Sequence, residues 1–187
     1  MKHELRLAPL PERPGEKKAD PAKQDAAGDE EVVEAHDPYI APEMQKWERI
    51  YRSGHDLLMP TGLVDTKHLK DNSAWKEKLF LLDTGAESML ISPAAAREVT
   101  KVSRDDSMGI RGIQGEVEKV YAAGRFTMAF AGLRLDSPSM TSIDTTNISH
   151  DDGVEVSGFI GGPALFQLVM HIDYRDNLVW CEYTPKK

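Results

Sequence analysis

The most constraining feature of the sequence is an aspartate between two apolar segments. Asp83-Thr84-Gly85-Ala86 follows the apolar run 79–82 and precedes a second apolar run at 89–91. Both runs have the length and composition of short β-strands. Burying an ionised carboxylate is costly unless the group is paired or binds a proton. The chain must therefore fold so that the loop after the first strand gives this carboxylate a partner or a proton.

Short strand-like segments separated by turn residues fill most of the chain after residue 56. They lie at 57–59, 63–64, 117–121, 126–130, 133–135, 139–143, 168–172 and 178–180. The last two flank Arg175-Asp176-Asn177, a turn typical of a hairpin. Short helices are expected at 43–53, from apolar residues at helical spacing, and directly after Ser92-Pro93. This pattern predicts a mostly β fold, a small closed or nearly closed β-barrel with one or two short helices.

Composition limits the classes of protein to which the chain can belong. The 187 residues carry a formal charge of −8. Because phosphate contacts need a basic surface, nucleic acid is not expected as a partner. Cys181 is the only cysteine, which excludes an intrachain disulfide. Residues 1–40, rich in charged residues and proline, predict a disordered tail or linker, and residues 41–187 are expected to form the folded domain.

The sequence shows no membrane span and no export signal. No apolar stretch approaches the roughly 20 residues that cross a bilayer, and the start, residues 1–6, lacks an apolar export core. A cytoplasmic location is the default expectation, and the alternative is that the chain is a fragment of a longer exported protein. His150-Asp151-Asp152 lacks the spacing of a metal site and predicts a polar loop. No metal or cofactor is therefore expected.

A pair of facing carboxylates can hydrolyse a peptide bond. One must be ionised to take a proton from a water held between them, and the other must be protonated to polarise the scissile carbonyl. Asp65-Thr66 and Asp144-Thr145 lack the glycine and the apolar lead-in of Asp83. The simplest route to a pair is a two-fold dimer in which Asp83 of each copy meets on the axis. The alternative is a turn aspartate that caps its own loop.

Two further segments accompany the Asp83 loop. Residues 109–115 have a glycine at every third position, and glycine-rich hairpin tips form mobile covers over clefts. A strand-like sequence follows this segment, so it does not match a dinucleotide-binding loop, which opens a helix. The second segment, Gly158-Phe159-Ile160-Gly161, leads into a short helix with Pro163 in its first turn. Its simpler interpretation is a strand-to-helix joint in the core.

In this order and spacing, the three segments resemble the retropepsin-like aspartic proteases, which include retroviral enzymes and bacterial single-domain aspartyl proteases. The resemblance covers about residues 56–183 and depends on 81–86, 109–115 and 158–161. It implies the acid-protease type of β fold, a homodimer, and an extended peptide held between a flap and the catalytic loops. The chain differs at Gly162, where the retroviral enzymes carry an arginine at the dimer contact. The dimer is therefore expected to be held differently or to be weak.

The resemblance also implies roles for individual residues. Asp83 would be the catalytic acid, Thr84 a bracing hydroxyl and Gly85 the backbone turn. The implied substrate-binding residues are Ala86, Glu87, Ile110, Arg111, Gly112 and Ile113. For Glu87 the alternative is a solvated loop charge. Ala86 cannot donate the hydrogen bond that a serine there would give to the carboxylate, so we expect activity closer to neutral pH than in serine-containing relatives.

The sequence therefore predicts an aspartic endopeptidase that acts on extended peptides or unfolded segments with apolar residues near the cut. The alternative is a non-catalytic peptide-binding or assembly domain that retains the protease fold. A third interpretation is that Asp83 pairs with an upstream domain of a longer parent chain.

Overall fold

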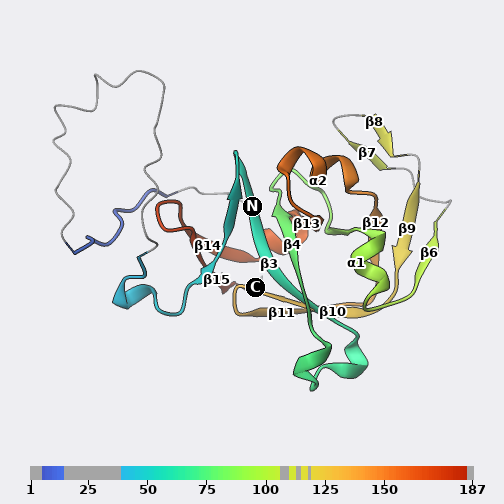
Figure 1. The fold of residues 1–187 in the computed structure, drawn as a ribbon, viewed down its shortest axis with the longest axis horizontal. Coiled ribbons are helices and arrows are strands. Elements are labelled where there is room, and N and C mark those ends of the chain that lie inside the picture. Colours follow the sequence, from blue (N-terminus) through green and yellow to red (C-terminus); the bar gives the residue numbers. More distant parts are fainter. Residues whose placement is uncertain (1–5, 15–38, 106–109, 113–114, 118, 185–187) are drawn as a thin grey trace.

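The structure is a computed structural model of the chain, and it describes residues 6–14, 39–105, 110–112, 115–117 and 119–184 (Figure 1). Most of the regular structure is β. The strands are β1 (Glu48–Arg49), β2 (Tyr51–Ser53), β3 (Asp56–Val64), β4 (Lys76–Leu82), β5 (Leu90–Ile91), β6 (Val102–Arg104), β7 (Ile110–Gly112), β8 (Gly115–Val117), β9 (Val120–Ala123), β10 (Phe126–Phe130), β11 (Leu133–Ser137), β12 (Met140–Ile143), β13 (Val156–Ile160), β14 (Leu168–Asp173) and β15 (Leu178–Tyr183). The α-helices are α1 (Pro93–Arg97), α2 (Thr146–Asp152) and α3 (Gly162–Leu165). Single 3₁₀ turns lie at Pro42–Met44, Thr66–His68 and Asn72–Ala74.

The described strands form one large sheet and two small ones. The large sheet has the order β11-β10-β3-β4-β13-β5-β12-β9-β6, with β2 added to β3. The order β1-β15-β14 makes a three-stranded sheet, and β7 and β8 form a hairpin. In Figure 1 the three-stranded sheet lies at one end of the molecule and β6 and β9 at the other. The predicted mostly β fold is confirmed, and the large sheet follows an open path, the nearly closed form of the prediction.

The centre of the large sheet brings together strands that are far apart in the sequence. β13 lies between β4 and β5 and runs parallel to β4, with Ile160 beside Leu82. Gly158 in β13 allows this close approach, because a Cβ there would lie 2.3 Å from the carbonyl oxygen of Leu90 and 2.5 Å from the ring of Phe80. The two segments that the sequence singled out, 79–82 and 158–161, are therefore neighbours.

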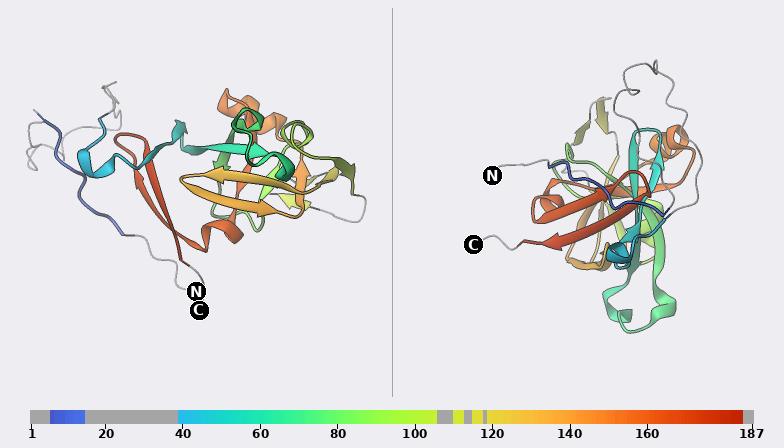
Figure 2. Two further views of the ribbon diagram at one scale, coloured as in Figure 1. Left: turned by 90° about the horizontal axis from the view of Figure 1, so that it is seen from below. Right: turned by 90° about the vertical axis from the view of Figure 1, so that its left-hand side faces the viewer.

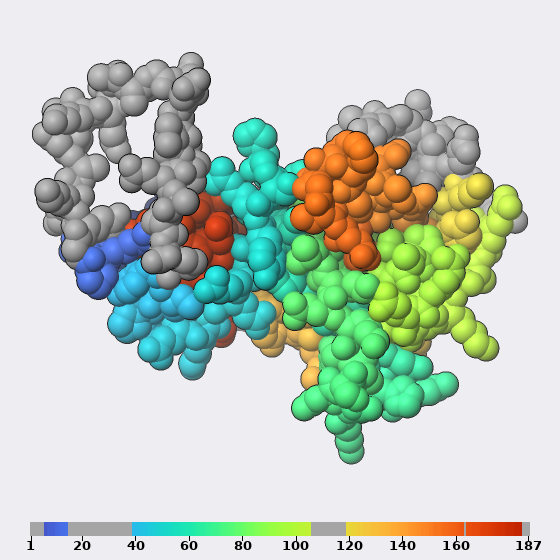
Figure 3. Space-filling view, in the orientation of Figure 1, coloured from blue at the N-terminus to red at the C-terminus, as the bar shows by residue number. Residues whose placement is uncertain are grey.

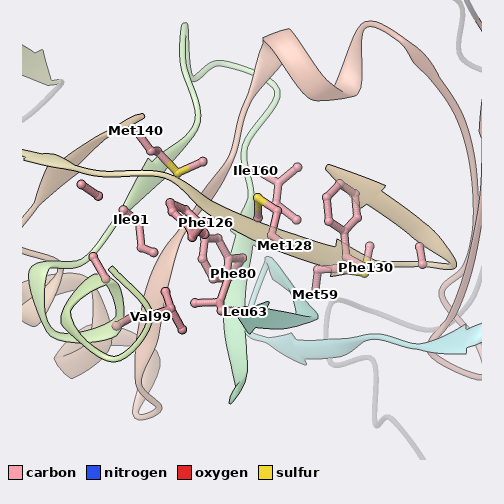
Figure 4. Packing of buried hydrophobic residues seen from close by; sticks show 14 of the residues in the cluster. Met59, Leu63, Phe80, Ile91, Val99, Phe126, Met128, Phe130, Met140 and Ile160 are labelled. Carbon is pink, nitrogen blue, oxygen red and sulfur yellow. The ribbon is translucent and has the colours of Figure 1, made fainter. Parts of the chain in front are cut away.

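One hydrophobic core holds the sheet in shape. Its members come mainly from strands across the large sheet, with others from β15, α1 and α3. The labelled ones in Figure 4 are Met59, Leu63, Phe80, Ile91, Val99, Phe126, Met128, Phe130, Met140 and Ile160. Phe80 and Ile160 are fully buried. Burying a large apolar side chain contributes roughly 1.5–3 kcal/mol. The strands that lead into residues 83 and 161 are thus anchored in the hydrophobic core by these side chains.

Two local predictions are confirmed and one is wrong. Ser92 caps α1, since its Oγ accepts a hydrogen bond from the N–H of Ala95 at 3.2 Å. The turn at 175–177 joins the paired strands β14 and β15. The helix expected at 43–53 does not form: one 3₁₀ turn precedes β1 and β2. Ile50 meets the core as an extended residue, 2% exposed, and its N–H donates to Asn177 O at 3.0 Å.

The polar excursion between β3 and β4 is attached to the sheet through Trp75. A Cβ on Gly62 of β3 would lie 2.9 Å from the Trp75 ring, so the ring rests directly on the strand backbone. The guanidinium of Arg134 lies 5.4 Å from the centre of this ring, a cation–π distance. The large ring and the missing side chain of Gly62 together explain how this insert is held.

Residues 6–14 contact the turn between β14 and β15. The guanidinium of Arg13 donates to the carboxylate of Asp176, and Arg175 Nη2 donates to Pro11 O at 2.8 Å. In Figure 2 this segment, drawn in blue, runs past the β14–β15 hairpin. The predicted disordered tail, 1–40, is described only at 6–14 and 39–40, and its division from a domain at 41–187 stays a prediction.

Candidate active site

The Asp83 loop begins where β4 ends. The N–H of Asp83 donates to Ile160 O at 3.1 Å, which continues the pairing of β4 with β13 by one more bond. The N–H of Gly85 then donates to Asp83 Oδ1 at 2.8 Å, and the N–H of Ala86 donates to Asp83 O at 3.3 Å. The carboxylate is therefore oriented by its own loop, which is also expected of a turn aspartate that caps its own loop. Asp83 as a whole is half-buried.

The first turn of α3 contacts the backbone of the Asp83 loop. The N–H of Gly162 donates to Ala86 O at 2.8 Å. A Cβ on Gly161 would lie 2.3 Å from Ser88 O and 3.0 Å from Ala86 O. Real side chains do not adopt the first distance and rarely adopt the second. Glycine at 161 is thus needed because two backbone segments touch there. Its neighbour Gly162 is nearly as crowded, since a Cβ would lie 2.8 Å from the ring of Phe166 and 3.2 Å from Ala86 O.

Solvent reaches the predicted catalytic and substrate-binding residues of the Asp83 loop. Asp83 and Ala86 are half-buried, whereas Thr84, Gly85 and Glu87 are exposed. The Asp83 carboxylate thus lies at the surface end of a strand whose middle, at Phe80, is fully buried. A second chain could approach the loop from this side.

The predicted flap is a β-hairpin in the described residues. β7 and β8 pair with Ile110 opposite Val117 and Gly112 opposite Gly115. The hairpin connects β6 to β9, which themselves pair in the large sheet. Arg111 lies opposite Glu116. Of the predicted flap tip, residues 110–114, Ile113 and Gln114 lie outside the described residues.

A second pair of carboxyl groups lies at the same end of the β3–β4 pair as Asp83. Asp56 begins β3 and Asp152 ends α2. Burial raises the pKa of Asp152, and the negative charge of Asp56, its hydrogen bond to Asp56 and the charge of Asp151 raise it further. Ser53 Oγ donates to Asp152 O at 2.9 Å. No local pattern indicated this pair, because its members lie 96 positions apart.

Two cavities lie near α2 or the Asp83 loop. The larger, about 880 Å³, lies between α1, α2 and β9 and is lined by residues such as Arg97, Tyr121 and Thr145, but not by Asp83. On the face shown in Figure 3, α2 (orange) lies directly above α1 (yellow-green). The smaller cavity, about 330 Å³, includes Ser88 and Met89, which follow the Asp83 loop. The smaller cavity, and not the larger one, therefore adjoins the Asp83 loop.

Metal ligands and membrane spans can be assessed only for the part of the chain that the structure describes. In that part, no three His, Cys, Asp or Glu side chains are grouped so as to share a metal ion. Likewise, none of the described helices combines the length and hydropathy needed to cross a bilayer.

Comparisons with known proteins add a likeness in fold. No protein-family profile matches the sequence, and no curated protein matches it. Among solved structures, the chain is similar to EIAV protease in complex with an inhibitor, with 17% identity and a TM-score of 0.41. The match covers 62% of this chain and 90% of that chain. At these values the likeness says nothing about activity or about individual residues.

Proposed function

We propose that the protein is an aspartic endopeptidase of the retropepsin-like kind, active as a homodimer. The observation that carries the proposal is the setting of Asp83. Asp83 directly follows the core strand β4. Its carboxylate accepts a hydrogen bond from the Gly85 N–H at 2.8 Å, and the residue is half-buried. The loop behind it is fixed by backbone bonds to Ile160 and Gly162, two residues far along the chain. This combination presents a carboxylate at a rigid position that a second copy can approach.

The proposed reaction needs one proton shared by two Asp83 carboxyl groups. Two carboxylates held close together do not both ionise readily, so the pair retains a proton. The ionised partner takes a proton from the bound water, whose oxygen attacks the scissile carbonyl carbon. The protonated partner gives its proton to the carbonyl oxygen. When the C–N bond breaks, the leaving nitrogen takes the proton that the pair now holds. One hydroxyl of the intermediate returns its proton to the pair as the carbonyl re-forms, so the pair again holds one proton.

Thr84 and Gly85 act on the loop in this proposal. Gly85 supplies the N–H that orients Asp83, and a Cβ on Gly85 would already lie 3.2 Å from Asp83 Oδ1. Thr84 is exposed, so its hydroxyl is available to brace the equivalent loop of the second copy. Both are positioning residues.

The proposed substrate is an extended peptide. Ala86, Glu87 and the flap residues Ile110 to Ile113 would line its path, with backbone pairing for affinity and side-chain pockets for selectivity. The smaller cavity beside Ser88 and Met89 is bordered by Leu135, Pro138 and Met140. Its apolar walls fit a substrate with apolar residues near the cut.

Cleavage of a peptide library tests the proposal. We expect pepstatin-sensitive cleavage by the wild-type chain, and a fall of about 10²- to 10⁴-fold in Asp83→Asn. Asp65→Asn is a matched control. Asp65 is also half-buried, and its Oδ1 accepts from the N–H two residues later, that of Lys67, at 2.9 Å. Unchanged cleavage in Asp83→Asn would reject the proposal. Binding of peptides without cleavage would favour the alternative of a non-catalytic domain.

A further inference from the structure

The turn between β14 and β15 holds two buried carboxyl groups. Asp173 is fully buried and Asp176 is 5% exposed. Asp173 Oδ1 accepts hydrogen bonds from the N–H groups of Arg175 and Asp176, at 2.8 and 3.1 Å. Its buried Oδ2 has no hydrogen-bond partner among the described residues. Asp176 Oδ2 accepts from Arg175 Nε at 3.1 Å. These three residues are here called the Asp176 site.

The Asp176 site needs a positive charge from outside the hairpin. Asp173 and Asp176 carry two formal negative charges, and Arg175 carries one positive charge. Burying an unpaired charge is costly, so a second cation stabilises the turn. Arg13 supplies it, since its guanidinium donates to Asp176 Oδ1 and its side chain is only 15% exposed. The site therefore binds a guanidinium group carried by a separate segment (Figure 2).

The Asp176 site also contacts the backbone next to this arginine. Arg175 Nη2 donates to Pro11 O at 2.8 Å, two positions before Arg13. Asp176 Oδ1 accepts a further hydrogen bond from the N–H of Tyr39 at 3.0 Å, so both oxygens of this carboxylate are held in place. A guanidinium, whose donors have a fixed planar geometry, matches such an acceptor better than the ammonium group of lysine does.

The segment that fills the Asp176 site is less firmly built into the fold than the site itself. Residues 6–14 form no helix or strand and belong to none of the hydrophobic clusters in the described part of the chain. Within this segment Pro11 and Arg13 are half-buried, and the other residues are exposed. The Asp176 site, by contrast, lies in a hairpin whose strands pair along their whole length. The segment can therefore leave while the site stays folded.

We propose that the Asp176 site is an exchangeable docking site for an extended peptide segment that carries an arginine. Residues 11–13 fill it in the free chain, and an arginine-bearing segment of a protein partner takes their place. The partner is selected by a guanidinium that meets the buried carboxylates and by a backbone carbonyl, two residues earlier, that accepts from Arg175. The inference is separate from the proposed cleavage, because the Asp83 loop supplies none of the three residues of the site.

Fluorescence anisotropy with a labelled synthetic peptide of residues 6–14 tests the proposal. Arg13→Ala in the full chain empties the site. This variant should bind the peptide about 10-fold more tightly than wild type, because a site filled by its own segment about nine-tenths of the time is free for only the remainder. The Arg13→Ala peptide should bind this variant at least about 10-fold more weakly than the native peptide, since it lacks the charged donor. The Arg6→Ala peptide is the matched control, because Arg6 is exposed, and should bind like the native peptide.

Thermal unfolding gives a second readout if the Arg13→Ala chain is unstable. The native peptide should raise the melting temperature of this variant, and the Arg13→Ala peptide should not. Equal effects of the two peptides, in binding or in melting temperature, would overturn the proposal, as would equal binding of the native peptide by wild type and variant. Adding Asp83→Asn should leave peptide binding unchanged, so peptide binding without cleavage would reject the enzymatic proposal and keep this one. Cleavage without peptide binding would do the reverse.

Discussion

The N–H of Gly162 donates a hydrogen bond to the carbonyl oxygen of Ala86 at 2.8 Å. Together with the bond from the N–H of Asp83 to Ile160 O, it fastens both ends of the Asp83 loop to one segment some 80 positions further along the chain. A catalytic group must be held to within a fraction of an ångström, and elements from the core hold it better than a free loop does. The geometry of the loop therefore depends on residues 160–162.

The first prediction concerns Gly161. Gly161→Ala places a Cβ 2.3 Å from Ser88 O, and the backbone must move to relieve it. We expect a loss of about 1–3 kcal/mol in the free energy of unfolding, measured with urea, and a fall in cleavage rate beyond the effect on folding. Gly54→Ala is the control: its φ of +55° is unfavourable for alanine, but nothing lies within 4 Å of the new Cβ. A Gly161→Ala protein with wild-type stability and rate would contradict this account.

The second prediction concerns Asp152. Burial and the neighbouring Asp56 raise the pKa of Asp152 above its usual 3.8. The folded protein then binds a proton that the unfolded chain has released, so this stability is present below pH 3.8 and is lost as the pH rises through the raised value. Asp152→Asn mimics the protonated group. We expect it to raise the melting temperature at pH 7 and to have no such effect near pH 3; equal shifts at both values would refute the prediction.

The third prediction concerns Asp176, whose pKa is shifted in the opposite direction to that of Asp152. Burial opposes its charge, but the Tyr39 N–H and the guanidinium groups of Arg13 and Arg175 outweigh burial and lower the pKa of Asp176. Its contribution is complete above pH 3.8 and is lost as the pH falls through the lowered value. Because Asp176 is 5% exposed, we expect Asp176→Asn to lose about 1–3 kcal/mol at pH 7 by urea unfolding. The difference from wild type should shrink towards pH 2, and a difference independent of pH would count against it.

The fourth prediction concerns Ala86. A serine hydroxyl at this position can donate to the proposed pair of Asp83 carboxyl groups and stabilise its ionised form. In Ala86→Ser we therefore expect the acidic limb of the pH–rate profile to move to lower pH, with little change in melting temperature because Ala86 is half-buried. Ala86→Val, which adds bulk without a donor, is the control and should not move the limb downwards. A profile unchanged by serine would end this interpretation.

Local signals in the sequence predicted local structure well. Ser92 followed by proline fixed the start of α1, and the turn at 175–177 fixed the β14–β15 hairpin, because each depends on residues within a few positions. The glycines of 109–115 predicted a hairpin for the same reason, and β7 and β8 form one. The roles given to Asp83, Thr84, Gly85 and the flap residues stay predictions, since they depend on a second chain.

Contacts between distant residues could not be predicted in the same way. The prediction of a helix at 43–53 was wrong, because apolar residues at helical spacing also suit a turn followed by two short strands. In the structure Met44 packs with Leu178, and Ile50 belongs to the main hydrophobic core. The parallel pairing of β13 with β4 and the meeting of Asp56 with Asp152 depend on the topology of the whole sheet. No window of the sequence contains both members of either pair.

The most direct test of the shared pair is a subunit-mixing experiment. Wild-type chains are mixed with Asp83→Asn chains at constant total concentration, allowed to exchange, and assayed for peptide cleavage. If each active site takes one Asp83 from each of two copies, activity should fall with the square of the wild-type fraction, because every mixed dimer is inactive. Activity that falls in simple proportion to the wild-type fraction would show that one chain suffices and would contradict the account.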